Sequence, residues 1–218
     1  MKRSGSAEAE VIPLPLITEQ LPASPDAALD ALLDATVECV ARYGLAKTSL
    51  SDIAREMGVA PSTVYRKVGT VENAVRLVMA REGHRMLESI PELVDGIEGP
   101  EVITVFLAEV ITAAVQHPVV SKILRDEPDW MGRLATRTLD ERLAEGAAVA
   151  APFLSAAMDA GHIRRQDPMA LAHWIVRIST MCLLSPPPGD LLVALNDLLL
   201  PLLTPETTAP AARRARKP

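Results

Sequence analysis

Aromatic side chains are scarce in this chain: Phe, Trp and Tyr together make up 3% of its 218 residues. Hydrophobic residues nevertheless account for 49% of the sequence, so the core must be built mainly from Ala, Leu, Val and Ile. Long stretches rich in Ala and Leu favour helix over strand. No run of alternating β-branched residues is long enough to indicate a sheet. The sequence therefore predicts an all-α protein that is large enough to bury a substantial core.

Cysteines and long apolar runs are also few. Cys39 and Cys182 lie far apart without a pairing pattern, which is typical of buried thiols in a reducing compartment. No uncharged apolar run reaches the roughly 18 residues that a membrane span requires. The apolar segment 11–17 is short and contains Pro13 and Pro15, so it does not resemble a signal peptide. We expect a cytoplasmic protein without a membrane partner.

The common enzyme motifs are missing from the sequence, which contains no GxSxG, HExxH, P-loop, GxGxxG or CxxC pattern. The four histidines are scattered, without the local carboxylate spacing of a metal site: they are His84, His117, His162 and His173. We therefore expect neither catalysis nor a metal or other cofactor.

The net charge of −6 is unevenly distributed along the chain. Residues 42–85 carry eight basic and four acidic side chains, whereas residues 86–212 carry eight basic and 17 acidic ones. A further four basic residues lie within 213–218. A basic segment of this kind is typical of a DNA-facing surface, and the acidic remainder would repel phosphates.

The basic segment contains a pattern for two short helices around a tight turn, LAKTSLSDIAREMGVAPSTVYRKVGTVE at 45–72. Ser49 and Asp52 have the spacing of a capping box, which predicts where the first helix begins. Gly58 stands where a left-handed helix end needs a residue without Cβ. Pro61 suits the first turn of the second helix, because its missing N–H costs nothing there.

The second helix has one apolar face and one polar face. Val64 and Val68 are four residues apart and should point inward. The residues between and beside them should point outward, namely Ser62, Thr63, Tyr65, Arg66 and Lys67. A helix-turn-helix of this form fits the major groove of B-DNA.

Residues 27–80 resemble the TetR-type (tetracycline-repressor-like) transcriptional regulators, through TSLSDIAREMGVAPSTVYRKVGTVENAV and the preceding ARYG at 41–44. The chain departs from the family at Val68, where Phe is frequent, and at Val71, where Lys is frequent. Ala60 also gives the second helix a weak N-cap. The resemblance implies DNA contacts to base edges from Pro61, Ser62 and Thr63, to phosphates from Thr48, Ser49, Tyr65 and Lys67, and further contacts from Ser51 and Arg66.

Four regions are expected along the chain. Residues 1–25 form a flexible arm, 26–72 a three-helix DNA-binding domain, 73–204 a helical bundle for effector binding and dimerisation, and 205–218 a basic flexible tail. Beyond the second helix of the pair, further helices are predicted at 70–89, 100–116, 118–126, 129–160 with a kink at Pro152, 168–185 and 190–203.

The last two predicted helices are apolar around most of their circumference. A helix of this kind must be buried on all sides, which in so small a chain favours burial against a second copy. We therefore expect a homodimer through 168–185 and 190–203 as a four-helix interface on a two-fold axis. Leu195 and Leu199 are expected to lie in this interface.

The resemblance also implies an effector cavity inside the bundle. Candidate wall residues are Met86, Phe106, Trp130, Met131, Phe153, Met158, His173, Trp174 and Arg177. Arg177 follows His173 by one helical turn in an otherwise apolar stretch. Its guanidinium needs either an ion pair, with Asp159, Asp167 or Asp197 as candidates, or an anionic group on the effector.

The sequence thus favours a ligand-responsive transcriptional regulator, a repressor by the family's usual mode. In this reading the protein binds a palindromic DNA operator as a homodimer and an unidentified small molecule releases it. The alternative is a helical ligand-binding or scaffold protein without operator binding.

Overall fold

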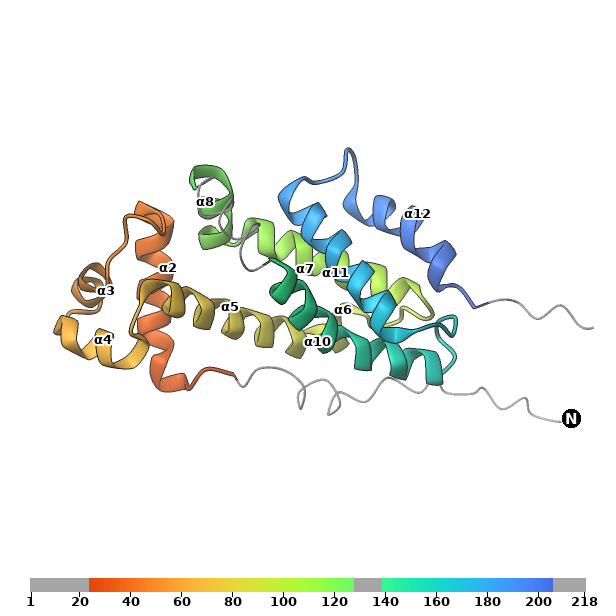
Figure 1. Ribbon diagram of the computed structural model, residues 1–218, viewed down its shortest axis with the longest axis horizontal. Coiled ribbons are helices and arrows are strands. Elements are labelled where there is room, and N and C mark those ends of the chain that lie inside the picture. The colour runs from red at the N-terminus through yellow and green to blue at the C-terminus, as the bar shows by residue number, and fades with distance from the viewer. Residues whose placement is uncertain (1–23, 128–138, 206–218) are drawn as a thin grey trace, which may run out of the picture.

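The computed structural model describes residues 24–127 and 139–205, and within these ranges every regular element is helical (Figure 1). The all-α prediction is confirmed. Trp130, Met131, most of the predicted arm and nearly all of the predicted tail lie outside the described residues.

The elements form an elongated molecule with a small head at one end (Figure 1). The head contains η1 (Ala27–Leu29), α2 (Asp30–Tyr43), α3 (Leu50–Met57), α4 (Pro61–Val68) and the start of α5 (Val71–Glu88). The body contains α6 (Ile90–Leu93), α7 (Glu101–Gln116), α8 (Pro118–Asp126), α10 (Leu139–Asp159), α11 (Pro168–Leu184) and α12 (Leu191–Leu203). The long α5 runs from the head along the body.

The helix ends follow the residues that predicted them. Thr70 caps α5 by accepting a hydrogen bond from the Asn73 N–H. Asp167 caps α11 by accepting from the Met169 and Ala170 N–H groups, and Pro168 occupies the first turn. The short α6 is an addition to the predicted set. The predicted helix 129–160 is described from Leu139 onward, and its earlier part lies outside the described residues.

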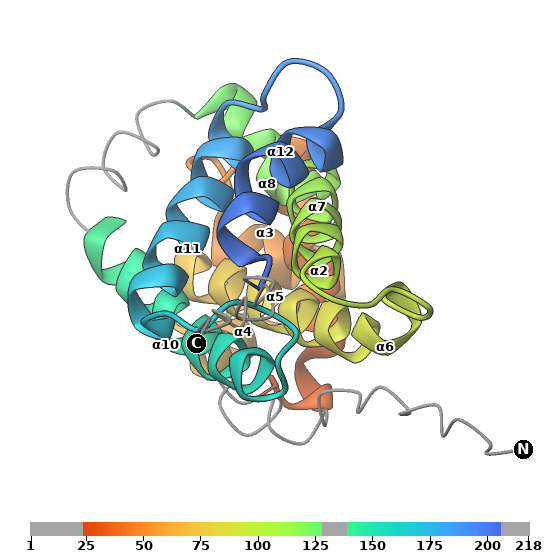
Figure 2. The ribbon, with the colours of Figure 1, turned by 90° about the vertical axis from the view of Figure 1, so that its right-hand side faces the viewer.

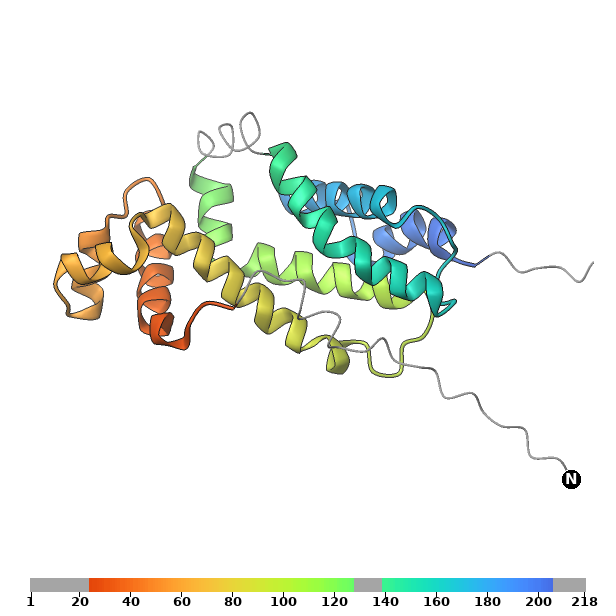
Figure 3. The same ribbon diagram turned by 60° about the horizontal axis from the view of Figure 1, so that its bottom comes forward.

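Two apolar cores organise the head and the body separately. The head core joins α2, α3, α4 and α5, whereas the body core joins α7, α10, α11 and α12. The ribbons of these four body helices form a bundle in Figure 2. A third, smaller cluster consists of Val40, Leu45, Val75, Val119 and Ile123. This cluster packs α8 against the head helices α2 and α5, so the head is fastened to the body through α8 (Figure 3).

The structure corrects the predicted position of Leu195 and Leu199. Both are 1% exposed and lie in the body core of their own chain, where α12 packs against α7. The outer faces of α11 and α12 instead carry exposed apolar side chains, namely Met169, Trp174, Met181, Leu184, Val193, Leu198 and Leu202. Each helix therefore buries one side in its own chain and leaves the other uncovered.

Within the described residues, no single helix is both long and apolar enough to cross a membrane. Only α7 and α8 together meet that criterion, and they are bent by 69° at their junction.

Candidate nucleic-acid interface

The start of α3 is fixed by the capping box that the sequence predicted. The Ser49 N–H donates to Asp52 Oδ2 at 3.0 Å, and the Asp52 N–H donates back to Ser49 Oγ at 3.2 Å. Hydrogen bonds from the Ser49 hydroxyl and then from its backbone N–H hold the pKa of the Asp52 carboxyl below its ordinary value. The carboxylate therefore stays charged and keeps the cap closed at neutral pH.

The turn between α3 and α4 has the geometry that Gly58 predicted. Gly58 lies in the left-handed region with φ 68° and ψ 29°, which a residue with Cβ adopts only with strain. The Val59 N–H donates to the Ala54 carbonyl at 2.9 Å and closes the turn. The next helix begins at Pro61, and its N-cap, Ala60, supplies no side-chain hydrogen bond.

The two faces of α4 are as predicted. Val64 and Val68 are buried in the head core and anchor the helix. The opposite face is open to solvent: Ser62, Tyr65, Arg66 and Lys67 are exposed, and Thr63 is half-buried. Ser49 and Ser51 are exposed at the start of α3. Most of the predicted contact residues are therefore exposed on the head.

Thr48 lies differently from the other predicted contact residues, because its side chain is buried. Its hydroxyl donates to the Gly44 carbonyl at 2.7 Å and is 3.3 Å from the Cys39 carbonyl. Thr48 therefore holds the loop that leads into α3. Burial raises the pKa of the neighbouring Cys39 thiol, which keeps it protonated and unreactive.

Lys67 also has a contact inside the head. Its Nζ donates to the Ala28 carbonyl at 3.1 Å, which ties the end of α4 to the turn η1 before α2. The ammonium group remains exposed, so its positive charge still faces solvent beside Tyr65 and Arg66.

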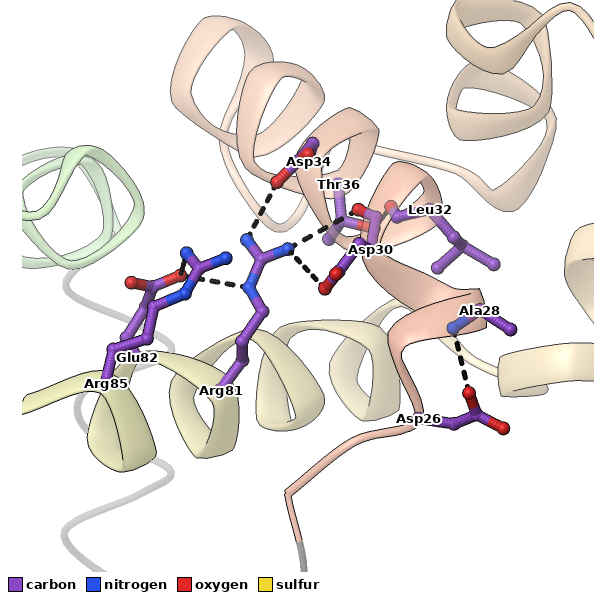
Figure 4. A network of polar contacts seen from close by, with 9 residues as sticks. All are labelled: Asp26, Ala28, Asp30, Leu32, Asp34, Thr36, Arg81, Glu82 and Arg85. Carbon is purple, nitrogen blue, oxygen red and sulfur yellow. Dashed lines mark hydrogen bonds and ion pairs between the residues drawn. The ribbon is translucent and has the colours of Figure 1, made fainter. Parts of the chain in front are cut away.

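An arginine network that sequence reasoning missed joins α5 to α2 (Figure 4). The Arg81 side chain is only 7% exposed and contacts Asp34 at 2.9 Å, Glu82 at 3.1 Å and Asp30 at 3.3 Å. Burial alone would lower the pKa of Arg81, but hydrogen bonds to Asp34 and Asp30 outweigh it and raise the pKa above its ordinary value. The network fixes α5, the helix that connects head and body, to the first turns of α2.

The predicted effector residues that the structure describes have different surroundings. Met158 is buried in the body core, and Phe106 packs against it. Met86 and Phe153 are half-buried, whereas Trp174 is 67% exposed on α11. One hollow in the described residues is lined by Met158 and the loop 161–165, and another lies between α5 and residues 24–30.

Arg177 and His173 contact each other as their spacing predicted. Arg177 Nη1 lies 3.2 Å from His173 Nδ1 and donates to the His173 carbonyl at 3.2 Å. At 100° per residue, both lie on the side of α11 opposite the buried Ile175. In the described part of the chain no carboxylate lies within 4 Å of Arg177. Of its predicted ion-pair partners, Asp159 binds Arg165 instead, and Asp167 caps α11.

Residues 32–67, which span α2 to α4, match the family model of bacterial regulatory proteins of the tetR family. No curated protein matches the chain. Several solved structures share its fold at less than 25% identity.

A TetR-family transcriptional regulator from Pectobacterium atrosepticum has a TM-score of 0.61 and 18% identity, with 81% of this chain and 94% of that one covered. The TetR-family repressor AlkX from Dietzia, implicated in biodegradation of n-alkanes, has a TM-score of 0.59 and 17% identity, with 83% and 97% covered. SmeT, the repressor of the Stenotrophomonas maltophilia multidrug efflux pump SmeDEF, has a TM-score of 0.55 and 16% identity, with 90% and 100% covered. The head of this protein thus matches the family model of tetR-type regulatory proteins, and the chain shares the fold of solved TetR-family structures.

Proposed function

We propose that the protein binds a palindromic DNA operator as a homodimer and that a small-molecule effector bound in the body releases it. The observation that carries this proposal is the exposed polar face of α4, held at a fixed angle by the capped α3, the Gly58 turn and the buried Val64 and Val68. A short helix presented in this way enters a major groove.

The proposed contacts divide by chemistry. Pro61, Ser62 and Thr63 lie in the first turn of α4 and read base edges. Ser49, Tyr65 and Lys67 bind phosphates, and the exposed Ser51 and Arg66 make further contacts. Thr48 acts indirectly in this proposal, because its hydroxyl is used within the head.

The proposed dimer uses the uncovered faces of α11 and α12. These faces expose several large apolar side chains, including Trp174, Met181, Val193 and Leu198, and exposed apolar patches mark interaction sites. A two-fold axis through them would bury the faces and direct both heads to the same side. Two heads related in this way match the two half-sites of a palindrome.

The division of the chain into a DNA-binding domain at 26–72 and an effector and dimerisation domain at 73–204 is part of the proposal. The boundary falls inside α5, whose Ala74 and Val78 belong to the head core. We regard α5 as shared by the two domains.

The two named repressors with this fold support a role in repression, and the effector of this chain would bind in its body as the family mode implies.

Replacing Lys67 with Ala should weaken binding to every DNA sequence and lower the slope of log affinity against log salt concentration by about 1, because one phosphate contact is lost. The measurement is a fluorescence anisotropy titration of wild type and variant at several salt concentrations, on operator and on unrelated DNA.

Thr63→Ala is the matched variant on the same helix. It should leave the salt slope unchanged and reduce discrimination between operator and unrelated DNA, because Thr63 is proposed to contact bases. If both variants bind operator as wild type does across the salt range, the proposed contact surface is wrong.

A further inference from the structure

The loop between α2 and α3 is held by a side chain from the body. The Ala46 N–H lies 3.1 Å from both carboxylate oxygens of Glu127, the residue that ends α8. Glu127 is 9% exposed and Ala46 is exposed, so the carboxylate is buried while the contact as a whole is part-buried. It joins residues 81 positions apart in the sequence and links the head to α8 by a directional bond as well as by apolar packing.

Gly44 leaves the space that the Glu127 carboxylate occupies. A Cβ at this position would lie 2.7 Å from Glu127 Oε1, which is closer than real Cβ atoms approach an oxygen. Gly44 also has φ 87°, a value that disfavours any other residue. The backbone of the loop and the carboxylate are therefore fitted to each other.

Charge complementarity does not explain why a carboxylate is buried here. Among the described residues Glu127 forms no ion pair, although Lys122 Cε lies near the same space beside Gly44. The carboxylate also stands at the C-terminal end of α8, where the helix dipole disfavours negative charge. The adjacent Asp126 takes the nearby cations, with Lys122 at 2.7 Å and Arg125 at 3.1 Å. Burying a charge with one shared N–H donor costs stability, so the position of Glu127 needs another explanation.

The loop that Glu127 holds leads directly into the DNA-binding surface. Thr48 closes the loop onto Gly44, and Ser49 caps α3 at the next position. Leu45, in the same loop, packs with Val119 and Ile123 of α8. A shift of α8 would therefore be transmitted to the start of α3 through both the apolar cluster and the carboxylate.

We infer that Glu127 is a positioning residue through which the body sets the orientation of the head. This inference rests on the proposed operator binding, because the orientation of the heads affects DNA affinity only when two heads of a dimer must occupy two half-sites together. With Glu127 in place the heads are held in one orientation. Without it each head samples a wider range of angles, and fewer dimers have both recognition helices at the operator spacing.

The test variant is Glu127→Ala, and it has two controls. Glu127→Gln keeps one acceptor oxygen. Asp126→Ala removes the same charge from the neighbouring residue, which does not contact the loop. Hydrogen–deuterium exchange of residues 44–49 reports the contact itself. Anisotropy titrations on a full palindromic operator and on an isolated half-site report its consequence.

For Glu127→Ala we expect the exchange of the Ala46 amide to become at least tenfold faster and operator affinity to fall about tenfold, with half-site affinity and salt slope unchanged. The tenfold figures follow from the strength of a hydrogen bond to a charged group. Glu127→Gln should retain most of the Ala46 amide protection and most of the operator affinity. Asp126→Ala should resemble wild type in both measurements.

A second variant approaches the contact from the loop. Gly44→Ala would push the carboxylate away, so its effect on operator affinity should be smaller in a Glu127→Ala background than alone. Fully additive effects would show that Gly44 and Glu127 act independently and would overturn the inference.

The outcomes also separate this inference from the proposed function. If wild type binds operator and Glu127→Ala binds it equally well or more tightly, Glu127 does not hold the DNA-binding orientation. If wild type binds no DNA, the proposed function fails. The contact is tested separately by amide exchange: if the Ala46 amide exchanges equally fast in wild type and Glu127→Ala, Glu127 does not hold the loop.

Discussion

Leu198→Glu is expected to produce a folded monomer that has lost operator binding, whereas Leu195→Glu, three residues earlier on the same helix, is expected to prevent folding. Leu198 is 50% exposed on the uncovered face of α12, and Leu195 is 1% exposed in the body core. A Glu at Leu198 would bury an unpaired charge only when the second copy binds. A Glu at Leu195 buries the charge within the chain itself, at a cost of several kcal/mol.

Sedimentation at micromolar concentration and far-ultraviolet circular dichroism distinguish these outcomes. Leu198→Glu should retain the helix content of wild type at half its mass, and Leu195→Glu should lose helix content or aggregate. Met181→Glu tests the same face from α11, where Met181 is exposed. Intact dimers from both Leu198→Glu and Met181→Glu would place the dimer interface elsewhere.

Arg81→Met is expected to lower the free energy of unfolding by about 2–3 kcal/mol. The substitution keeps most of the side-chain volume but removes the guanidinium that contacts Asp30, Asp34 and Glu82. We place the loss below that of a fully buried ion pair because Asp30 and Asp34 are themselves largely exposed and water can solvate them after the change.

Arg85→Met is the matched control for this prediction. Arg85 also contacts Glu82 at 3.1 Å, but its side chain is exposed, so its loss should cost less than about 0.5 kcal/mol. Urea denaturation of the three proteins measures the difference. Equal stabilities for Arg81→Met and Arg85→Met would show that the network in Figure 4 does not fasten α5 to α2.

The DNA-binding head could be predicted closely because its determinants are local. Ser49 and Asp52 form their cap within one helical turn, and Gly58 needs only its own backbone geometry to end α3. Pro61 and Pro168 begin helices for a local reason too, because proline fits the first turn of a helix. Each of these features depends on residues a few positions apart, so the amino-acid order alone carries the information.

The outer face of the body could not be predicted because α11 and α12 contain few polar residues to mark it. An apolar pattern on all sides indicates that both sides are buried but cannot say which side faces the same chain. Leu195 and Leu198 are chemically identical, and only the packing of α12 on α7 distinguishes them. The mutual contact of His173 and Arg177 was predictable from their spacing, but their position opposite the core was not.

The contacts between head and body were missed for a related reason. Arg81 reaches Asp30 across 51 positions, and Glu127 reaches Ala46 across 81. No local pattern marks such pairs, since a single Arg in α5 or Glu at the end of α8 is usually solvated. They become visible only when the fold brings α5 and α8 against α2.

Selection from a random-sequence DNA library with the purified full-length protein tests the central claim most directly. We expect enrichment of a two-fold symmetric sequence whose half-sites are about one helical turn apart, or a whole number of turns. Two recognition helices of a symmetric dimer must enter the major groove on one side of the duplex. The selected DNA should bind one dimer in a saturable, salt-dependent manner. Enrichment of no sequence, with binding that does not saturate, would contradict operator recognition by this protein and favour a helical ligand-binding or scaffold role.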